Sequence, residues 1–442
     1  MMRTSLYIFI TVLSLSLAAP TRATAQATAT ARQEILANPN LSGGNPAVYP
    51  EPTGVTYTRP PRGYKPCYLS AYIRHGSRFH WDTHGYSRPH QTLQKAHDAD
   101  KLTPLGQHVY GIVDSLTRAA DRRIGELTQI GARQHRGIAQ RMVRNFPEIF
   151  RADVRVSARS STAVRCALSM LNECWTIEGL CPKAVIRCNA SEHDMSYINY
   201  EEPRMKAYRK RPESRQAFDD AYHRLLQADR LMGALFNDTA YVAHHVKKDQ
   251  LFMELYSLAN HVQNHDVYHD ARGRNPQLDL FPIFTDDELY DWAKFINYYN
   301  YLTHGYNTQT LDKAPLTRAS LLRNIILTAD TCLASGRRNV TLRFGHDMVL
   351  MPLACLMHLG NCAAHADSPE ELITEWRNYN IFPMAGNIQL VFYRKKNAPT
   401  LVKVMLNERE QTLPLHSDTA PYYPWHEVRA YYMGLLEQAD TE

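Results

Sequence analysis

The 442-residue sequence has only one long apolar run, residues 6–19. That run is too short to cross a bilayer, which takes about 20 residues, and the mean hydropathy of −0.43 also argues against a membrane-spanning protein. The run follows Met1-Met-Arg3 and precedes Ala23-Thr-Ala25, a small-x-small pattern. A basic start, an apolar middle and this ending predict a signal peptide of residues 1–25. We therefore expect an exported protein, periplasmic or extracellular, with no stable membrane span.

Several catalytic signatures are missing as well. The chain contains no G-x-x-x-x-G-K-[ST], no G-x-S-x-G and no H-E-x-x-H, so P-loop, serine-hydrolase and zincin functions have no support. It has no C-x2-C pair, and His80 and His84 lie in a segment without a helical pattern, so no metal site is expected.

The charge balance is only mildly basic. Removal of residues 1–25 takes away two arginines and no acid, which leaves 48 basic against 44 acidic residues, a net charge of +4. There is no dense basic tail, so nucleic acid is not an expected partner. A small anionic substrate is compatible with this charge.

The cysteine count is even, at eight. In an exported chain this predicts disulfides. Cys174, Cys181 and Cys188 are close enough in sequence to pair locally, and Cys355 with Cys362 is the preferred local pair.

Strand and helix patterns alternate at both ends of the chain. Residues 26–66 read as an extended lead-in and residues 80–100 as a polar loop. Short apolar and β-branched runs predict strands at 67–73, 153–157 and 339–344, and a hairpin-like pair at 388–393 and 401–406. Helical patterns follow Thr128 and cover 162–175 and 349–359.

The middle of the chain is different. Long helical patterns cover 216–236, 250–264 and 286–301, and residues 200–335 show no clear strand. The sequence therefore predicts an α/β fold, with a sheet core made of residues 67–199 and 336–442 and an inserted α-helical cap of residues 200–335.

Three of the predicted strands end in charged or polar segments. Residues 67–73 run into Arg-His-Gly, the strand at 153–157 into Ala-Arg-Ser-Ser, and residues 339–344 into Gly-His-Asp. Ligands of open α/β sheets bind beyond the carboxyl ends of the strands. We therefore expect these segments to converge on one site.

The residue types of this site suit phosphoryl transfer. A neutral His75 is a good nucleophile, and Arg74 and Arg78 lower its pKa and bind phosphate through paired N–H donors. Gly76 allows a tight turn, so that the ring and both arginines face one oxyanion. The expected scheme is transfer of phosphate to His75, followed by hydrolysis of the phosphohistidine.

Three further residues complete the scheme. Arg165 supplies a third guanidinium, His346 hydrogen-bonds the transferring group, and Asp347 gives a proton to the leaving alkoxide. Each has a structural alternative when taken alone. Arg165 could be a solvated side chain on its helix, and His346-Asp347 could be a helix N-terminus at which Asp347 accepts hydrogen bonds from backbone amides. Their position after successive strands favours the catalytic interpretation.

These motifs resemble a known family. Residues 74–78 match the R-H-G-x-R motif of the histidine acid phosphatases, and His346-Asp347 matches their late H-D pair. Residues 126–134 resemble the L-T-x-x-G-x-x-Q helix start, and Arg165 resembles the arginine after the second strand. Residues 401–408 and 413–414 resemble the tail of the inositol polyphosphate phosphatase branch, so the resemblance spans about residues 67–415.

The resemblance implies a mixed central sheet flanked by helices, with an inserted α-helical cap and no metal or organic cofactor. It also implies a role for each matched residue. His75 is the phosphorylated nucleophile and Asp347 the proton donor, and the phosphate binders are Arg74, Arg78, Arg165 and His346.

Two positions depart from the family pattern. The family often has Pro where this chain has His80, which affects the wall of the distal pocket. The inositol polyphosphate phosphatase branch often has H-A-E where this chain has His346-Asp347, which leaves a phytase or a broad acid phosphatase open.

The expected function is therefore hydrolysis of phosphomonoesters, with inositol polyphosphates such as phytate as the preferred substrates. Lys206, Arg209 and Arg211 of the cap are candidates for holding extra phosphates, although exposed helix faces explain them equally well. The alternatives are a broad-specificity acid phosphatase or sugar phosphatase, and a non-catalytic phosphate-binding protein. A phosphate-transferring mutase fits poorly with the signal peptide.

Overall fold

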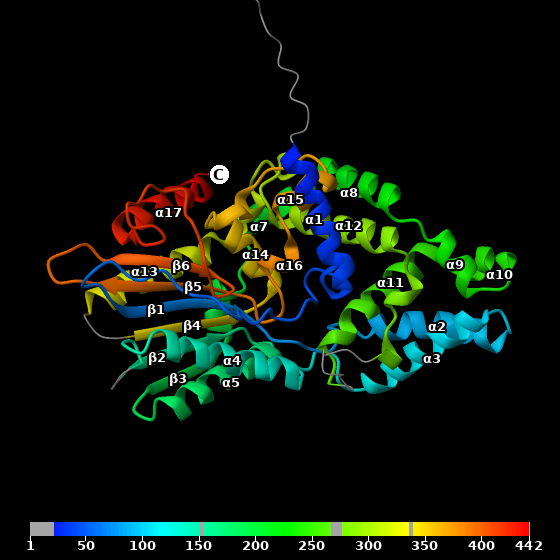
Figure 1. The fold of residues 1–442 in the computed structure, drawn as a ribbon, viewed down its shortest axis with the longest axis horizontal. Coiled ribbons are helices and arrows are strands. Elements are labelled where there is room, and N and C mark those ends of the chain that lie inside the picture. The colour runs from blue at the N-terminus through cyan, green and yellow to red at the C-terminus, as the bar shows by residue number, and fades with distance from the viewer. Residues whose placement is uncertain (1–21, 151–153, 267–275, 336–338, 442) are drawn as a thin grey trace, which may run out of the picture.

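The structure is a computed structural model that describes residues 22–150, 154–266, 276–335 and 339–441. One mixed sheet fills the left half of the molecule in Figure 1, and a helical part fills the right half. The described strands of this sheet are β1 Lys65–Arg74, β2 Arg155–Ser160, β3 Val185–Ala190, β4 Asn339–Gly345, β5 Asn387–Arg394, β6 Leu401–Leu406, β7 Arg409–Glu410 and β8 Tyr423–Pro424.

The strand order is β3-β2-β4-β1-β5-β6-β7, with β8 paired to β6. β1, β2, β3 and β4 run parallel to one another. β5 pairs antiparallel with β1, and β6 pairs antiparallel with β5, so that β5 and β6 form the predicted hairpin. In the register of the parallel strands Arg74 lies opposite Gly345, and Ser160 lies opposite Phe344. The predicted α/β class with a mixed sheet is confirmed, and all three predicted strand ends lie side by side.

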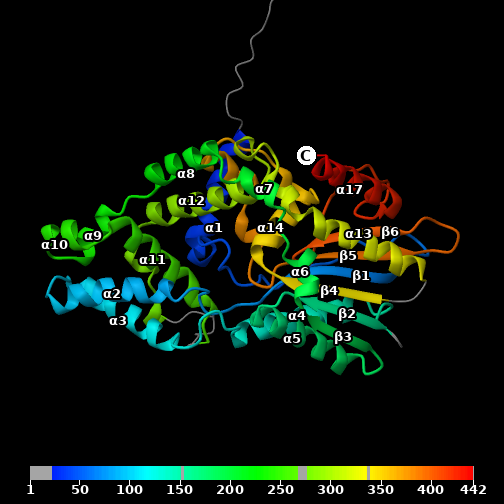
Figure 2. The ribbon, with the colours of Figure 1, turned by 180° about the vertical axis from the view of Figure 1, so that it is seen from behind.

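Helices cover both faces of the sheet. α4 Gln129–Asn145 and α5 Val164–Leu180 pack on one face, over side chains such as Val156 and Leu342. α13 Ala319–Ala334 and α17 Trp425–Asp440 lie over the other face, as Figure 2 shows from behind. Because side chains alternate along a strand, β1 sends Leu69 to the first face and Tyr68 to the second.

The helical part is built from segments of the middle of the chain and from the region after β1. Its longer helices are α2 His84–Asp98, α3 Pro104–Ala119, α8 Pro212–Leu225, α11 Lys248–His261 and α12 Asp286–His304. Short helices of this part are α7 Pro203–Tyr208, α9 Asp229–Leu235 and α10 Thr239–His245, whereas α6 Glu192–Ile198 packs against β2 and β4 of the sheet. The short 3-10 turns are η1 Pro39–Leu41, η2 Val262–Asn264, η3 Pro276–Leu278, η4 Phe281–Ile283, η5 Thr308–Thr310, η6 Ala314–Arg318 and η7 Gly360–Ala363. The remaining helices are α1 Arg22–Ala37, α14 Asp347–Leu356, α15 Pro369–Glu375 and α16 Asn378–Ile381.

The boundaries of the predicted cap stay a prediction. α2 packs against α11 and α3 against α9, so the segment after β1 adds to the helical part. α13, at the end of the predicted cap, packs against β1.

The predicted extended lead-in is wrong for residues 26–37, which belong to helix α1. The segment is rich in Ala, the best helix former, and Ala31 and Ile35 lie on one face, one turn apart. Both side chains are fully buried, together with Tyr290 of α12 and Ile373 of α15. Tertiary packing of this short apolar stripe explains the helix. Most of the predicted signal peptide, residues 1–21, lies outside the described residues.

The predicted polar loop at 80–100 is also wrong, because α2 occupies most of it. Tyr86, Pro89, Leu93 and Ala96 are its buried residues, spaced by three or four positions. The many polar residues between them conceal this stripe in the sequence.

The predicted disulfides are not present among the residues that the structure describes. Cys355 in α14 and Cys362 in η7, the preferred local pair, are both free thiols. Spacing along the chain does not fix the approach of two Cβ atoms that a disulfide requires. Within the described part of the chain, no helix is long and apolar enough to cross a membrane.

Candidate functional site

The site lies beyond the carboxyl ends of β1, β2 and β4. The backbone N–H of His75 donates to the carbonyl of Gly345 at 2.9 Å, which ties the segment after β1 to the end of β4. The rings of His75 and His346 lie 5.6 Å apart, edge to face. The two histidines that the sequence predicted for one site are therefore neighbours.

His75 has a defined tautomer. Its Nδ1 lies 2.9 Å from the carbonyl oxygen of Gly76. A carbonyl only accepts, so Nδ1 carries the proton and Nε2 keeps a lone pair. Burial, Arg74 and Arg78 together hold the pKa of the imidazole well below its usual value. His75 is thus neutral and nucleophilic in mildly acidic solution.

Arg74 is fixed on three sides. It is fully buried, and its Nη1 donates to the carbonyl oxygens of Asn45 and Phe382, both at 2.7 Å. Its Nη2 donates to Oδ2 of Asp347 at 3.0 Å. These bonds set the plane of the guanidinium before any ligand arrives.

Arg78 is also buried, and its Nη1 donates to the carbonyl of Phe79 at 3.0 Å. Burial and the charge of Arg74 lower its pKa to about 9. Arg165 comes from the first turn of α5. The Nε–H groups of Arg74, Arg78 and Arg165 are buried and make no hydrogen bond within the described residues. An oxyanion supplies the acceptors that such donors require.

His346 lies between Arg165 and Ser161. Arg165 Nη2 is 3.4 Å from Nδ1 of His346, and the Ser161 hydroxyl is 3.2 Å from its Nε2. A guanidinium only donates, so Nδ1 accepts and Nε2 carries the proton. Burial and Arg165 lower the pKa of His346 to about 4, which keeps it a neutral hydrogen-bond donor.

Asp347 is the first residue of α14. Its Oδ1 accepts from the backbone N–H of Met348 at 2.9 Å, so part of the helix-start alternative is present. Its Oδ2 accepts from Arg74 and from the Asn45 amide at 2.8 Å. Burial acts to raise its pKa, but Arg74, Arg78 and the hydrogen bond from Asn45 outweigh burial and hold the pKa well below its usual range. Asp347 is ionised in the ligand-free site.

The loop that carries His75 is supported by α4. A Cβ on Gly76 would lie 2.6 Å from Cα of Gly131, so two backbones touch there. Gln134 binds Ser77 twice, accepting from its N–H and donating to its hydroxyl, each at 2.9 Å. Thr128 caps α4 through the N–H of Gly131 and also bonds the carbonyl of Ser77. This explains the Leu-Thr-x-x-Gly-x-x-Gln pattern as a clamp on the loop.

His80 continues this loop into the helical part. Its backbone N–H donates to the hydroxyl of Tyr86 at 2.9 Å, and its ring lies 4.6 Å from the ring of His261. Burial lowers the pKa of both histidines, and the nearby Arg78 adds to this. The position at which the family often has Pro is therefore held by packing against α2 and α11.

The cap residues are distributed unevenly. Arg209 and the deeply buried Arg318 share the carboxylate of Glu201. Arg318 Nη2 also donates to the carbonyl of Met348 at 2.9 Å, directly after Asp347. Arg209 therefore connects to the site through one shared carboxylate.

The other two cap candidates are less closely tied to the site. Lys206 is half exposed and lies 3.5 Å from Glu201. Arg211 pairs with Glu213 at 3.0 Å. Arg209 and Lys206 thus share Glu201, but the Arg209 side chain is mostly buried and Lys206 is exposed, while Arg211 pairs elsewhere.

Sequence reasoning missed several members of the site. Asn45 comes from the lead-in, where Gly43-Gly-Asn-Pro46 signals a turn but not a function. Ser161 is predicted only as part of the polar segment that follows the strand at 153–157. Arg318 and His304, which is buried near Arg209, come from the helical part and carry no motif. Among the described residues, no group of three or more metal-ligating side chains is present.

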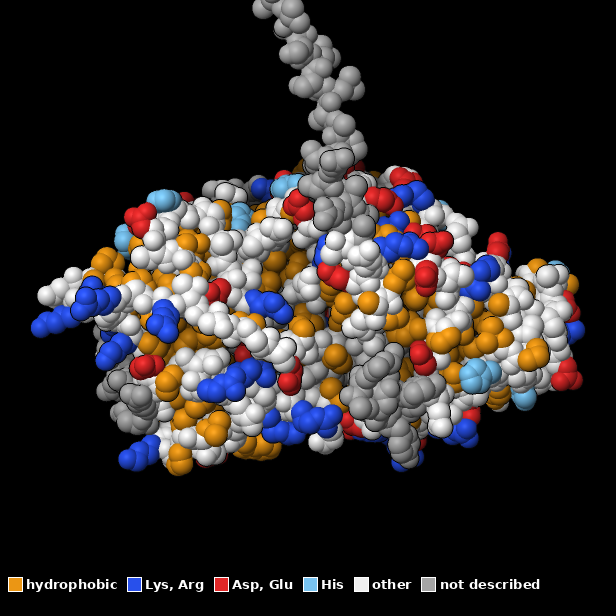
Figure 3. All heavy atoms as spheres, in the orientation of Figure 1, with side chains coloured by type: hydrophobic (Ala, Val, Ile, Leu, Met, Phe, Trp, Pro, Cys, Tyr) orange, Lys and Arg blue, Asp and Glu red, His pale blue; other side chains and the backbone are white. Residues whose placement is uncertain are grey.

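The charge of the surface favours an anionic ligand. On the face seen in Figure 3, Lys and Arg side chains gather over the half of the molecule that holds the sheet. Such a distribution attracts anions before contact.

Comparisons with known proteins place the fold. No protein-family model matches the chain, and no curated protein matches it in sequence. Solved structures with a similar fold include the Bifidobacterium longum multiple inositol polyphosphate phosphatase in complex with inositol hexasulfate, with a TM-score of 0.71 at 17% identity over 89% of this chain and 97% of that chain. A phytase from D. castellii has a TM-score of 0.61 at 13% identity, over 90% of this chain and 85% of that one. A Hafnia alvei phytase in its apo form has a TM-score of 0.52 at 12% identity, over 86% and 99%. The predicted resemblance is confirmed at the level of the fold.

Proposed function

We propose that the protein is a phosphoric monoester hydrolase of the histidine acid phosphatase type, which acts through a phosphohistidine. The observation that carries the proposal is the arrangement around His75: a neutral imidazole whose Nδ1 is held by Gly76, next to three guanidinium groups whose buried Nε–H groups find no acceptor among the described residues. The likeness in fold to phytases and to an inositol polyphosphate phosphatase supports it.

In the first step, Nε2 of His75 attacks phosphorus and the bond from phosphorus to the ester oxygen breaks. Arg74, Arg78 and Arg165 neutralise the phosphoryl oxygens, and the Nε2–H of His346 donates to one of them. The leaving alkoxide takes a proton from Asp347.

In the second step, water attacks the phosphorus of phosphohistidine. Asp347, now a carboxylate, takes the proton of the water, and the bond to Nε2 breaks. Phosphate leaves, and His75 returns to its starting tautomer. Nδ1 keeps its proton throughout, because the Nδ1–H stays hydrogen-bonded to the carbonyl oxygen of Gly76.

Asp347 must first acquire a proton, because Arg74 and Asn45 keep it ionised in the free site. A phosphate group that binds Arg74 competes with Asp347 for that guanidinium. The loss of this partner raises the pKa of the carboxyl, so that it takes up a proton as substrate binds. Substrate binding itself thus prepares the acid.

For the substrate we propose inositol polyphosphates such as phytate. The B. longum phosphatase, which has a similar fold, holds inositol hexasulfate, an analogue of such a compound. Arg318, which bonds Met348, and Arg209, which shares Glu201 with it, provide positive charge near Asp347.

A broad-specificity acid phosphatase or sugar phosphatase is the second candidate. Lys206 and Arg209 already pair with Glu201, and Arg211 pairs with Glu213, which reduces the positive charge left for further phosphates. This pairing favours a substrate with a single phosphate. We further propose export to the periplasm or the extracellular space, on the signal-peptide pattern of residues 1–25.

The test of activity is phosphate release from inositol hexakisphosphate, sugar phosphates and p-nitrophenyl phosphate by wild-type protein and by His75→Ala. The variant should lose roughly a thousandfold or more of kcat on every substrate, because no neighbouring group replaces the nucleophile. Acid quench of the wild type with labelled substrate should trap an acid-labile phosphoprotein. His416→Ala, a change at an exposed histidine, is the control and should keep full activity. Near-normal turnover by His75→Ala contradicts the proposal.

The test of substrate class compares two cap variants. Arg209→Ala should raise KM for inositol hexakisphosphate and leave KM for p-nitrophenyl phosphate unchanged, whereas Lys206→Ala should change neither. Equal effects of Arg209→Ala on both substrates would favour the second candidate.

A further inference from the structure

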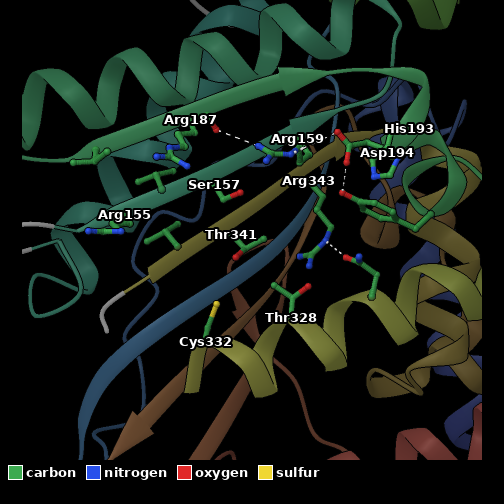
Figure 4. A pocket seen from close by; sticks show the side chains of 15 residues that line it. Arg155, Ser157, Arg159, Arg187, His193, Asp194, Thr328, Cys332, Thr341 and Arg343 are labelled. Atoms are coloured by element: carbon green, nitrogen blue, oxygen red, sulfur yellow. Dashed lines mark hydrogen bonds and ion pairs between the residues drawn. The ribbon is translucent and has the colours of Figure 1, made fainter. Parts of the chain in front are cut away.

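A polar cavity lies on the sheet, on the face opposite α4 and α5. It has a volume of about 600 Å³, which is within the usual range for small-molecule sites. Figure 4 shows that side chains of β2, β3 and β4 and of helices α6 and α13 line it. None of the residues placed in the candidate catalytic site lines this cavity.

The cavity exists because helices leave part of this face uncovered. α13 packs over β1, and α6 packs over part of β2 and β4, but every residue of β3 is at least partly exposed. Parallel strands buried on both faces are normally apolar on both sides. Here β2 presents Arg155, Ser157 and Arg159 on the open face, and β3 presents Val185 and Arg187. These side chains are not those of a face built for a core.

The charge of the lining is strongly positive. Arg155 and Arg187 form no ion pair with a carboxylate among the described residues, and both are exposed. The acid in the lining is Asp194, which is buried, accepts from Tyr197 at 2.8 Å and lies 3.5 Å from Nε of Arg159. Positive charge therefore remains in excess around the cavity.

Deeper in the cavity, Arg343 is almost completely buried. Its Nε donates to Asn324 at 2.8 Å and its Nη1 to the Ser70 hydroxyl at 3.0 Å, with no acid as a partner among the described residues. Burial lowers the pKa of this guanidinium. A buried cation without a carboxylate is costly, and an anion in the cavity would offset that cost.

The spacing of the arginines on β2 and β3 indicates a ligand with several anionic groups. Arg187 on β3 lies opposite Ser157 on β2. Arg155 and Arg159 are therefore each displaced from Arg187 by two residues along the strand direction. With strands about 4.8 Å apart and a rise of about 3.3 Å per residue, neighbouring arginine Cα atoms lie about 8 Å apart. Each guanidinium binds one phosphate in a bidentate manner, so the row matches several phosphates better than one.

We propose that this cavity binds a small polyanion carrying at least two phosphate groups, at a site separate from the catalytic one. The proposal does not depend on the proposed function, since it rests on other side chains. If both hold, one molecule carries a reactive and a non-reactive site for related anions on the same strands, β2 and β4.

The test is isothermal titration calorimetry with inositol hexasulfate, whose sulfate esters stand in for phosphates. Wild-type protein should show two binding events. Arg155→Gln with Arg187→Gln should weaken one of them by about tenfold or more, as expected for lost charge-assisted hydrogen bonds. Turnover of p-nitrophenyl phosphate and the melting temperature should stay unchanged.

Arg59→Gln with Arg62→Gln is the matched control, because it removes the same charge from two exposed arginines outside the cavity. It should leave both events intact. Arg78→Gln should weaken only the other event, which separates failure of the catalytic site from failure of the cavity.

Two outcomes overturn the proposal. One is a single event that Arg78→Gln removes and the Arg155 and Arg187 variant does not. The other is binding of heparin or duplex DNA, lost with Arg155 and Arg187, without a second event for inositol hexasulfate, which would assign the surface to a polymer.

Discussion

Arg74 and Asp347 form an ion pair, with Nη2 of the guanidinium 3.0 Å from Oδ2 of the carboxylate. One residue ends β1 and the other begins the helix after β4, so the pair links the two strands that meet at the site. The same arginine is proposed to hold the transferring phosphate. The protonation of the acid and the binding of the substrate are therefore coupled through one side chain.

The first prediction concerns Asp347→Asn. A general acid matters in proportion to the need of the leaving group for a proton, which is large for an inositol alkoxide and small for p-nitrophenolate. The variant should slow release from inositol or sugar phosphates by about a hundredfold or more, and from p-nitrophenyl phosphate much less. Steady-state rates on both substrates measure this. Equal slowing of both substrates, with a lower melting temperature, would mean that Asp347 only stabilises the start of α14 through the N–H of Met348 and does not act as the acid.

The second prediction concerns the acid limb of the pH profile. His75 must be deprotonated to attack, so kcat/KM should fall as pH drops through its lowered pKa, well below 6.5. Arg78→Gln removes one of the positive charges that lower this pKa, so the pKa should rise. The limb of kcat/KM should then move to higher pH, and kcat/KM should fall at every pH. A limb that stays in place or moves to lower pH contradicts the assignment.

The third prediction tests the contact between the His75 loop and α4. In Gly76→Ala the new methyl group would lie 2.6 Å from the backbone of Gly131, so the loop must shift. We expect a loss of about 1–3 kcal/mol of stability and most of the activity. Gly179→Ala, in α5 with open space around the glycine, is the matched control and should stabilise by about 0.5–1 kcal/mol. Denaturant unfolding of both variants checks the contrast.

The fourth prediction concerns thiol reactivity. A hydrogen bond from Cys174 lowers the pKa of the exposed Cys188 to about 7, whereas burial raises the pKa of Cys355 to about 12. Iodoacetamide at neutral pH should therefore modify Cys188 first and leave Cys355 untouched in the folded protein. Peptide mapping by mass spectrometry follows both sites. Cys188→Ser should abolish the fast phase, and early modification of Cys355 would disagree with the fold.

The parts of the site that follow strands were predictable from sequence. Arg74, His75 and His346 stand directly at strand ends, and parallel strands bring their carboxyl ends to one edge. Asn45 was not predictable, because it reaches Asp347 across most of the chain, from a segment with turn residues alone. Arg318 was missed for the same reason: its role depends on how η6 packs against α14.

The helices were predictable where apolar residues recur at helical spacing and are not hidden among many polar residues. α12 was expected at 286–301 and ends only three residues later. α2 was missed because only a few apolar residues form its buried face, among many polar ones. The single helix predicted at 216–236 is two helices in the structure, α8 and α9. The strand β3, with its largely exposed face, offers no buried run to read.

Asn45 also sets a limit for anyone who shortens this chain. A version that starts at residue 65 would keep every recognisable motif, from Arg74 to Asp347. It would lose two hydrogen bonds made by Asn45: the one from its side-chain amide to Oδ2 of Asp347, and the one from Nη1 of Arg74 to its backbone carbonyl. Such a truncation would pass a motif search and still carry a damaged centre, so cloning boundaries belong upstream of the Gly43-Gly-Asn-Pro46 turn.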